Sequence, residues 1–554
     1  MKNCILLFLL FSGALVSCKN NNGVEETENG KEEEKDKKIS SRDYSITKLI
    51  AYNDLFIDSN TVASFLDTAQ ISDKIKRRIT SFYNARNYQF AWLSSVGLTE
   101  QAKGFWNLYL YDSKHKNDSL PQNKKLQAKM DNLFAEQDLK VSSTDKNYIQ
   151  TELILTHFFI EHSLTVYEDG YVKRKEMERF VPIKKTNPLR LADSLLSKKH
   201  KNDKYFDDIN ESYKNIKGYL AKYMEVAKKG GWPVVQTTAK SIKPGSASPA
   251  ILTIKKRLLL SGDYKGQDTT DIYDPSLEEA VRSFQERHGY TPDGIIAAST
   301  IKEMNISVEE TIQKLLINLD RMRWMPSKPS GNLIVVNIPE FVMHVTEGSK
   351  KVFDMNVVVG KEGNGTVMFT DELNQIVFSP YWNVPESIVR EEIVPSMNKN
   401  PNYLAAHNME IVSQQGDLPV VRQLPGGKNA LGKVKFLFPN SFNIYFHDTP
   451  SKSLFKQDKR AYSHGCIRLA EPEKMANYLL ANNPEWTPEK INEAMNAGEE
   501  KFVTLKNPIP VFITYYTAWV DEQGRLNFRG DIYGHDAKLA RKMFDVPARS
   551  MAVK

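Results

Sequence analysis

The chain has 554 residues, and its 75 Lys and Arg against 68 Asp and Glu give a formal net charge of +7. The basic residues are spread along the chain without a basic block interleaved with aromatic residues, which argues against a nucleic-acid partner. Only three cysteines occur, so a disulfide framework is not expected, and the length predicts two to four domains beyond the N-terminal region.

Residues 1–17 have the pattern of a signal peptide. Lys2 supplies a positive charge, and the apolar run 5–16 is shorter than the ~20 residues that span a bilayer. The run ends in Leu-Val-Ser-Cys18, which resembles a bacterial lipobox and implies cleavage before Cys18 and its lipidation. An ordinary secretory signal is the alternative. Acyl chains on Cys18 would hold the mature protein on a membrane leaflet, since each buried methylene contributes roughly 0.8 kcal/mol.

Residues 18–45 are predicted to be a disordered tether. Between residues 19 and 43, 14 of 25 residues are charged, a composition that cannot bury enough apolar surface to fold. The expected location is the cell envelope, on a membrane facing the periplasm. An acidic stretch after a lipidated cysteine is also an export signal in some bacteria, so surface exposure stays open.

Residues 46–240 are predicted to form a helical scaffold domain. Ser72 has the position of an N-cap, and residues 145–170 carry a broad apolar stripe at helical spacing. His157 and His162 lie on or near this stripe and are interpreted as packing or surface residues, not metal ligands.

Residues 247–306 form a compact helical pattern. Ile251, Ile254 and Leu258 share one face, and Asp274-Pro275 starts a second helix. The run "LEEAVRSFQERHGYTPDGIIAAST" resembles a three-helix peptidoglycan-binding domain. Some members of that family only pack against neighbouring domains, so glycan contact stays open. A linking helix is predicted over 307–330, with Ser307 and Glu310 as a capping box.

From residue 331 the hydrophobic period changes to two, which predicts a mostly β domain over 331–545. The expected strands include "NLIVVNIPEFVMHV", "KVFDMNVVVG", "NQIVFSPYWNV", "FNIYFHD" and "VFITYYT". Residues 386–430 interrupt them with proline-rich, partly helical sequence and are predicted to form a capping insertion. The fold class is therefore multidomain α+β.

The stretch "YSHGCIRLA" contains Cys466, which would be a lone thiol once Cys4 is cleaved off and Cys18 is lipidated. Alternation in "FNIYFHD" puts Tyr445 and His447 on one face, and the 15 residues between His447 and Ser463 allow a loop that returns beside the strand. Imidazole can take the thiol proton, and amides around Gly465 and Cys466 can face an attacked carbonyl.

Three interpretations of this cluster are open from the residues alone. Cysteine and histidine can be ordinary packed residues, as free cysteines often are. His447, His464 and Cys466 can be a Cys/His₂ zinc site, although no surrounding hydrogen-bonding shell is recognisable. The third interpretation is thiol catalysis.

The motif closely resembles the YkuD-type L,D-transpeptidases, which carry histidine, a spacer, [S/T]-H-G-C and then Arg or Asn. The similarity extends through "SPYWNVPESI", "NPNYLAAHNMEI", "RQLPGGKNALGKVKFLFPN" and "TAWVDEQGR", and it resembles the large YcbB-like subgroup. That subgroup joins a helical scaffold, a peptidoglycan-binding module and a capping insertion to an L,D-transpeptidase-type catalytic domain.

The resemblance implies a mechanism without metal or organic cofactor. Cys466 would attack the carbonyl of the third stem residue of peptidoglycan and expel D-alanine, with His447 as general base and acid. An amine of a neighbouring stem would resolve the thioester and form a 3→3 cross-link. Acylation of Cys466 by carbapenems is also implied. The alternatives are an L,D-carboxypeptidase and a non-enzymatic lipoprotein that anchors the wall.

Other residues have weaker expectations. Ser463 and His464 are expected to shape the thiol loop, and Arg468 to bind a substrate carboxylate or to brace the loop through a salt bridge. Tyr445 and Trp382 can contact substrate or belong to the packed interior. Whether Asp448 orients His447 or faces solvent stays open.

Overall fold

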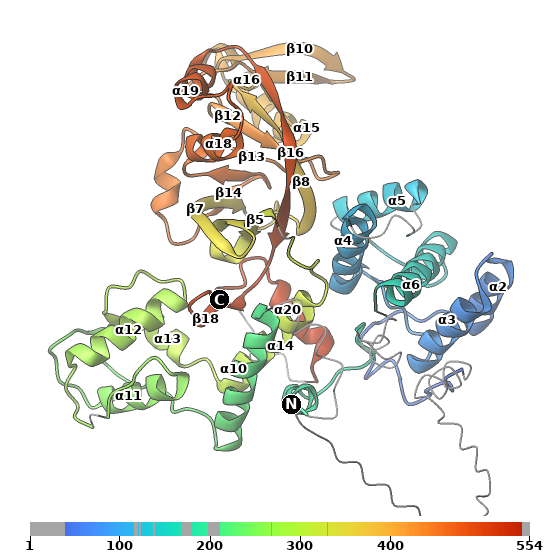
Figure 1. Cartoon of the computed structure of the whole chain (residues 1–554), viewed down its shortest axis with the longest axis vertical. Helices are drawn as coiled ribbons and strands as arrows, with labels where there is room; N and C mark the ends of the chain where they lie inside the picture. Colours follow the sequence, from blue (N-terminus) through green and yellow to red (C-terminus); the bar gives the residue numbers. More distant parts are fainter. Residues whose placement is uncertain are drawn as a thin grey trace, which may run out of the picture.

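The chain consists of a helical N-terminal part, a small helical module and a large β domain, so the predicted α+β class is confirmed (Figure 1). The computed structural model describes residues 39–115, 120, 123–136, 139–167, 180–197, 211–267, 269–329 and 331–545. The predicted signal peptide, Cys18 and most of the tether lie outside the described residues. No helix in the described ranges is both long and apolar enough to cross a membrane.

The N-terminal helices enclose an aromatic core that includes Trp92, Phe105 and Phe159. The buried Glu152 carboxylate accepts hydrogen bonds from the N–H groups of residues 91, 92 and 93, which holds the "FAWL" segment against this core. Ser72 accepts from the Ile75 N–H, so the predicted N-cap is confirmed. The helices are α2 (Ser59–Thr68), α3 (Asp73–Ala85), α4 (Glu100–His115), α5 (Lys124–Ala135), α6 (Lys146–Tyr167), α8 (Pro188–Leu196) and α10 (Glu211–Lys228); a short hairpin is formed by β1 (Leu93–Ser94) and β2 (Gly97–Leu98).

The two histidines of α6 lie among packed side chains. His162 is buried, with Nε2 2.9 Å from the Asp112 carboxylate. His157 is partly buried beside Glu161. These positions agree with their interpretation as packing residues.

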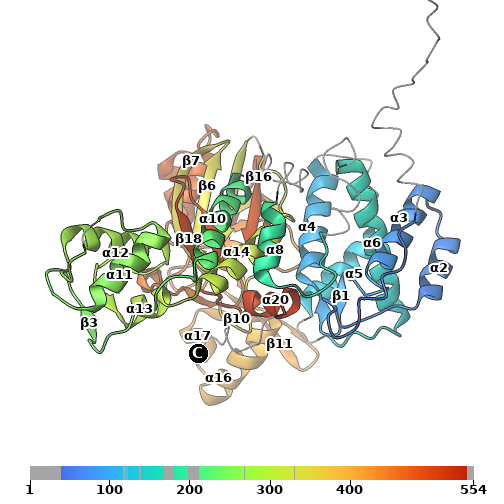
Figure 2. The same cartoon turned by 90° about the horizontal axis from the view of Figure 1, so that it is seen from below.

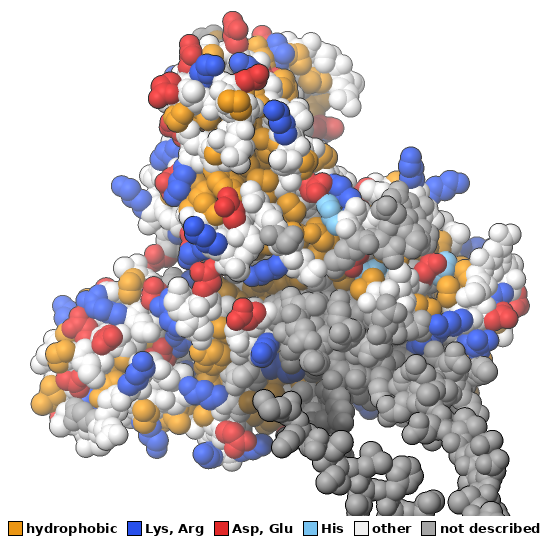
Figure 3. All heavy atoms as spheres, in the orientation of Figure 1, with side chains coloured by type: hydrophobic (Ala, Val, Ile, Leu, Met, Phe, Trp, Pro, Cys, Tyr) orange, Lys and Arg blue, Asp and Glu red, His pale blue; other side chains and the backbone are white. Residues whose placement is uncertain are grey.

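The small helical module has its own core and lies on the opposite side of the β domain from α2–α6 (Figure 2). Asp274 accepts from the Leu277 N–H at the start of α12, as its position before a proline predicts. The His288 ring stacks on Phe528 with ring centroids 5.1 Å apart, so the module contacts the C-terminal segment. Its elements are β3 (Ser241–Ile242), α11 (Ala250–Ser261), α12 (Pro275–Arg287), β4 (Ile296–Ala297) and α13 (Ala298–Met304). Figure 3 shows basic and acidic side chains intermixed on one face of this module.

The linking helix α14 (Val308–Met322) starts with the predicted capping box of Ser307 and Glu310. Its apolar residues lie in the core of the N-terminal helices, together with those of β17 (Ala518–Val520), β18 (Leu526–Phe528) and α20 (His535–Met543). The C-terminal segment therefore returns from the β domain to the scaffold core.

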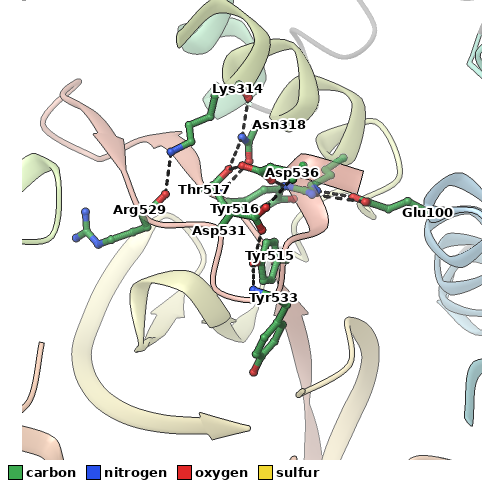
Figure 4. Close-up of polar contacts among 12 residues, drawn as sticks. Glu100, Lys314, Asn318, Tyr515, Tyr516, Thr517, Arg529, Asp531, Tyr533 and Asp536 are labelled. Carbon is green, nitrogen blue, oxygen red and sulfur yellow. Dashed lines mark hydrogen bonds and ion pairs between the residues drawn. The ribbon is translucent and has the colours of Figure 1, made fainter. Parts of the chain in front are cut away.

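Arg321 on α14 ties three parts of the chain together. Its buried guanidinium contacts Glu100 of the scaffold and Asp536 of α20; Figure 4 shows these two carboxylates together with Asn318 and Thr517. Asn318, one turn earlier, exchanges hydrogen bonds with Thr517 at 2.9 and 3.0 Å. This polar cluster fixes the C-terminal segment against the linking helix.

Replacing Arg321 with methionine is expected to lower the free energy of unfolding by about 3–5 kcal/mol, because a buried ion pair that loses one partner leaves an uncompensated charge. The measurement is the shift of the denaturant midpoint of the chain. Arg390→Met is the matched control: its ion pair with Glu386 is exposed on both sides, so a loss below about 1 kcal/mol is expected. Equal shifts in the two variants would contradict the structural role of Arg321.

The β domain is built on a mixed sheet that closes into a ring. The strand order is β14-β7-β15-β13-β12-β8-β16-β5-β6, and β6 pairs again with β7. Helices α18 (Pro472–Leu480) and α19 (Pro488–Asn496) pack on its core. The strands are β5 (Asn332–Asn337), β6 (Val342–Glu347), β7 (Lys350–Gly360), β8 (Phe369–Phe378), β12 (Val434–Leu437), β13 (Phe446–His447), β14 (Ala461–Ser463), β15 (Ile467–Leu469) and β16 (Lys501–Thr514).

Several strand predictions were wrong in extent, two of them for a clear local reason. "NLIVVNIPEFVMHV" forms two antiparallel strands, β5 and β6, because Pro339 has no N–H and Phe341 takes φ 61° in the turn between them. "FNIYFHD" forms a strand only at Phe446–His447. Asn440 explains this, since its side-chain amide bonds both the N–H and the carbonyl of Ile444 in place of a neighbouring strand.

The capping insertion has a small core and sheet of its own at the far end of the β domain from α14 (Figure 1). Its sheet order is β10-β11-β9, so the insertion includes Trp382 and begins slightly before the predicted 386. Residues 389–393 form a π-helix. Its elements are β9 (Trp382–Asn383), α15 (Glu386–Ile388), η3 (Val389–Ile393), α16 (Val394–Lys399), α17 (Tyr403–Ala406), β10 (Met409–Gln415) and β11 (Leu418–Gln423).

Candidate active site

The pairing of β13 with β15 brings the predicted histidine and cysteine onto one face of the sheet. The two strands are parallel, with Phe446 opposite Ile467 and His447 opposite Arg468. Phe446 and Ile467 are fully buried in the core. Because side chains alternate along a strand, the residues next to them face the other way. The predicted return of the loop beside the strand is confirmed.

The Cys466 thiol is half-buried and lies beside Tyr445. Its Sγ is 3.5 Å from the backbone carbonyl oxygen of Asn443, which accepts the thiol proton in a hydrogen bond. Burial raises the pKa of this thiol, while hydrogen bonds from the Tyr445 N–H and hydroxyl and the charge of Arg468 oppose that rise. The resting group is therefore a neutral thiol at pH 7.

His447 is buried and its tautomer is fixed by the backbone. Its Nδ1 is 2.5 Å from the carbonyl oxygen of Asp448. A carbonyl only accepts, so Nδ1 carries the proton and Nε2 is left with a lone pair. Burial lowers the pKa of His447 to about 3, and the nearby charge of Arg468 adds to this shift. The imidazole is therefore neutral across the physiological range and able to accept a proton.

Cys466 and His447 are not hydrogen-bonded to each other in the described structure. Both side chains lie on the same face of adjacent strands, with the thiol directed to Asn443. Hydrogen bonds between a catalytic acid or base and its partner are often long before substrate binds and shorten in the complex. The arrangement is a neutral nucleophile and a neutral base on one face of the sheet, with Arg468 opposite His447 and Cys466 two residues before it.

The Asp448 carboxylate stabilises the neighbouring backbone and does not orient the imidazole. It accepts hydrogen bonds from the N–H groups of Lys433 and Thr449 and is 2.7 Å from the Lys452 ammonium. A Cβ at Gly432 would lie 2.3 Å from one of its oxygens. Of Asp448, only the backbone carbonyl contacts His447.

The side chain of Ser463 stabilises the thiol loop by hydrogen bonds to the loop backbone. Its hydroxyl donates to the Cys466 carbonyl at 2.6 Å and accepts from the Gly465 N–H at 3.2 Å. The Gly465 amide, which the sequence suggested for stabilising an oxyanion, is thus already engaged. Gly465 has φ 115°, which favours glycine. The Cys466 N–H donates no hydrogen bond to a described residue and remains able to face a substrate oxygen.

His464 connects the thiol loop to the cap. Its Nε2 is 3.2 Å from the carboxylate of Glu392 in the π-helix, and both side chains are partly exposed. The sequence analysis did not identify Glu392, because no local pattern distinguishes it from the other acidic residues of the cap. His447, His464 and Cys466 do not converge: no cluster of three such ligand side chains exists in the described part of the chain.

Arg468 and Trp382 lie in different parts of the β domain. Arg468 lies opposite His447 on the same face, where its charge acts on both His447 and Cys466, and its Nε is buried without a hydrogen-bond partner. It forms no ion pair with a carboxylate of the described ranges, so the predicted brace is not seen there. Trp382 pairs with Gln423 at the base of the cap and packs against the core of the cap.

Replacing Tyr445 with phenylalanine is expected to raise the pKa of the Cys466 thiol further. The thiolate would lose the hydroxyl donor, and a hydrogen bond to a charged group contributes about 1.5–3 kcal/mol. A higher pKa leaves less thiolate at pH 7, and the greater intrinsic nucleophilicity of the more basic thiolate offsets only part of that loss. We therefore expect the rate of alkylation by iodoacetamide at pH 7 to fall by about 3- to 10-fold. Tyr462→Phe, an exposed tyrosine of the same loop, is the control. An unchanged rate in Tyr445→Phe would contradict the contact.

Three family models match this chain, and each match falls on one of the three main hydrophobic cores. Residues 331–513 match the model described as "L,D-transpeptidase catalytic domain" (YkuD). Residues 247–304 match "Putative peptidoglycan binding domain", and residues 77–220 match "Scaffold domain".

Similar proteins include a Haemophilus influenzae protein named "Putative L,D-transpeptidase". It is 32% identical over 255 residues, which are 43% of this chain and 50% of that protein. The chain thus spans about half the length of this curated relative. Among solved structures, an L,D-transpeptidase from Stackebrandtia nassauensis is 14% identical, with a TM-score of 0.21 over 50% of this chain and 97% of that one. L,D-transpeptidase 3 from Mycobacterium tuberculosis, in complex with a faropenem-derived adduct, is 15% identical, with a TM-score of 0.18 over 33% and 60%.

Proposed function

We propose that this chain, which carries an L,D-transpeptidase catalytic domain of the YkuD type at residues 331–513, forms 3→3 cross-links in peptidoglycan through a thioester on Cys466. The observation that carries the proposal is the pairing of β13 with β15, which places the thiol and a buried neutral imidazole on the same face of the sheet. The peptidoglycan-binding-type module at residues 247–304 supports the same substrate class.

The first step is acylation of the thiol. As Sγ of Cys466 attacks the carbonyl carbon of the third stem residue, Nε2 of His447 takes the thiol proton. The Cys466 N–H is available to stabilise the oxyanion. Collapse of the tetrahedral intermediate breaks the bond to D-alanine, and the His447 proton passes to the leaving amine.

The second step reverses these roles. A side-chain amine from a neighbouring stem attacks the thioester carbon and forms the new amide bond. His447 takes a proton from the amine and returns it to the departing thiolate. No metal or organic cofactor takes part in this scheme. Resolution by water in place of the amine would make the protein an L,D-carboxypeptidase.

The cap bears on the outcome of the second step, because water competes with the acceptor amine for the thioester. The contact of Glu392 with His464 joins the cap to the thiol loop. A cap seated on the loop limits access of bulk water to the thioester, which favours transfer over hydrolysis.

Anchoring to the envelope is part of the proposal. The lipobox-like sequence before Cys18 supports lipidation there and attachment to a membrane facing the periplasm, with the tether holding the scaffold away from the lipid. Stem peptides and glycan would then be the partners of the catalytic domain and the small module. We also expect carbapenems to acylate Cys466.

The test uses protein that begins at Ile39, since Ser40 and Asp43 bond to α3. It is incubated with a purified tetrapeptide muropeptide, and products are followed by mass spectrometry. The control is the same protein with its thiol blocked by iodoacetamide. A dimer lacking one D-alanine, absent from the control, is expected. Tripeptide alone would identify a carboxypeptidase, and no thiol-dependent product from folded protein would favour a wall-anchoring role.

A further inference from the structure

The loop that joins β7 to β8 lies directly against the thiol loop. Thr366 in this loop is 3% exposed, and its hydroxyl donates to the carbonyl oxygen of Gly465 at 2.7 Å. The same hydroxyl accepts from the N–H of Gly360 at 3.0 Å. Strand β14 runs parallel to β7, with Ser463 opposite Gly360. One hydroxyl thus joins the end of β7 to the residue before Cys466.

The contact with Gly465 has a consequence for Cys466 because the peptide unit between them is planar. In a trans peptide the carbonyl of one residue and the N–H of the next point in opposite directions. Fixing the Gly465 carbonyl therefore fixes the direction of the Cys466 N–H. That N–H is the donor left available for a substrate oxyanion.

Tyr533 holds Thr366 in place. Its hydroxyl donates to the Gly360 carbonyl at 2.6 Å and accepts from the Thr366 N–H at 3.2 Å, which closes the β7–β8 loop across its base. A Cβ at Gly365 would lie 3.2 Å from the ring, so the loop lies close against Tyr533. Tyr533 is outside residues 331–513, which match the catalytic family.

The C-terminal segment anchors Tyr533 in turn (Figure 4). The Tyr533 N–H donates to the Tyr515 hydroxyl at 2.9 Å, and that hydroxyl donates to Asp531 at 2.7 Å. Asp531 also accepts from the Ala537 N–H at the start of α20. The neighbouring Asp536 pairs with Arg321, so this chain of contacts ends on the linking helix.

We propose that Thr366 and Tyr533 are positioning residues that orient the Cys466 N–H toward the oxyanion, so that the C-terminal segment around Tyr533 contributes to the geometry of the active site. This inference rests on the proposed function only in taking Cys466 as an acyl-accepting nucleophile. Thr366 acts through Gly465, and Tyr533 acts through Thr366.

The test compares two reactions of the same thiol in the full chain. With 4-nitrophenyl acetate, the Cys466 sulfur forms a bond to the acetyl carbon and 4-nitrophenolate leaves, while the thiol proton passes to His447. The tetrahedral intermediate of this reaction carries its negative charge on the former carbonyl oxygen. Alkylation by iodoacetamide displaces iodide at a saturated carbon and has none. Thr366→Val removes the hydroxyl with little change of shape, and Thr366→Ser restores it. Thr370→Val, whose hydroxyl faces the Asn107 carbonyl in the scaffold, is the matched control.

We expect Thr366→Val to lower the burst rate of 4-nitrophenolate by about 10- to 100-fold and to leave alkylation within about 2-fold. Thr366→Ser and Thr370→Val should stay within about 3-fold of the parent protein in both reactions. Tyr533→Phe, a second variant that keeps the Thr366 hydroxyl, should lower only the acylation rate, by about 3- to 10-fold.

The proposal is overturned if acylation by Thr366→Val stays within 3-fold of the parent, or if acylation and alkylation fall together in every folded variant. If Thr366→Val does not fold, the same criteria apply to Tyr533→Phe. A parent protein that is acylated by the ester but yields no product from the muropeptide would refute the proposed function alone, because the ester reaction does not depend on peptidoglycan.

Discussion

Cys466→Ala is expected to abolish formation of the acyl-enzyme and of every product from the tetrapeptide muropeptide. The described part of the chain offers no second thiol to take its place, and the neighbouring Ser463 hydroxyl is engaged with the Cys466 carbonyl and the Gly465 N–H. Cys466→Ser should retain less than about 10⁻³ of the acylation rate, because the hydroxyl is far less acidic than the thiol and a neutral imidazole cannot deprotonate it readily. Intact-protein mass spectrometry checks for the acyl adduct directly.

The fold provides the control for this experiment. Cys466 is half-buried and lies outside the main core of the β domain, so the alanine variant should unfold at nearly the same denaturant concentration as the parent. Release of D-alanine by a folded Cys466→Ala protein would contradict the assignment of Cys466 as the nucleophile.

His447→Gln is expected to lower the acylation rate by about 10²–10⁴-fold, the usual contribution of a general base. Glutamine keeps a donor for the Asp448 carbonyl but supplies no basic nitrogen. The alkylation profile of the thiol should be nearly unchanged, because the groups that oppose the rise of the Cys466 pKa are Tyr445 and Arg468 and not His447. Loss of acylation with retained alkylation is therefore the signature of this variant.

The pH dependence of the parent protein follows from the same geometry. The pKa of His447 is lowered to about 3, so the base is unprotonated above that pH and is lost only as the pH falls through it. Acylation should accordingly show no inflection near 6.5, the ordinary pKa of histidine. A limb near 6.5 in the parent that disappears in His447→Gln would contradict the buried neutral imidazole. His157→Gln on α6 of the scaffold is the matched control.

Residues close together in the sequence were predictable because their interactions are local. The caps at Ser72, Asp274 and Ser307 bond amides three residues ahead, and the sequence shows both partners at once. The alternation around His447 and the lone thiol in "SHGC" likewise indicated a nucleophile and base on one sheet. The strand lengths near residues 338 and 443 were wrong, because the side chain of Asn440 and the turn before Phe341 replaced ladder hydrogen bonds.

By itself the sequence determined the order of the domains, the helix starts and the identity of the candidate nucleophile, since each depends on spacing within a few turns or strands. Only the tertiary structure decided which atoms surround that nucleophile. Thr366 meets Gly465 across 99 residues, Tyr533 meets Gly360 across 173, and Arg321 meets Asp536 across 215. A hydrogen bond between such distant residues leaves no local periodicity, because its geometry exists only after the sheet has closed and the C-terminal segment has packed against the linking helix.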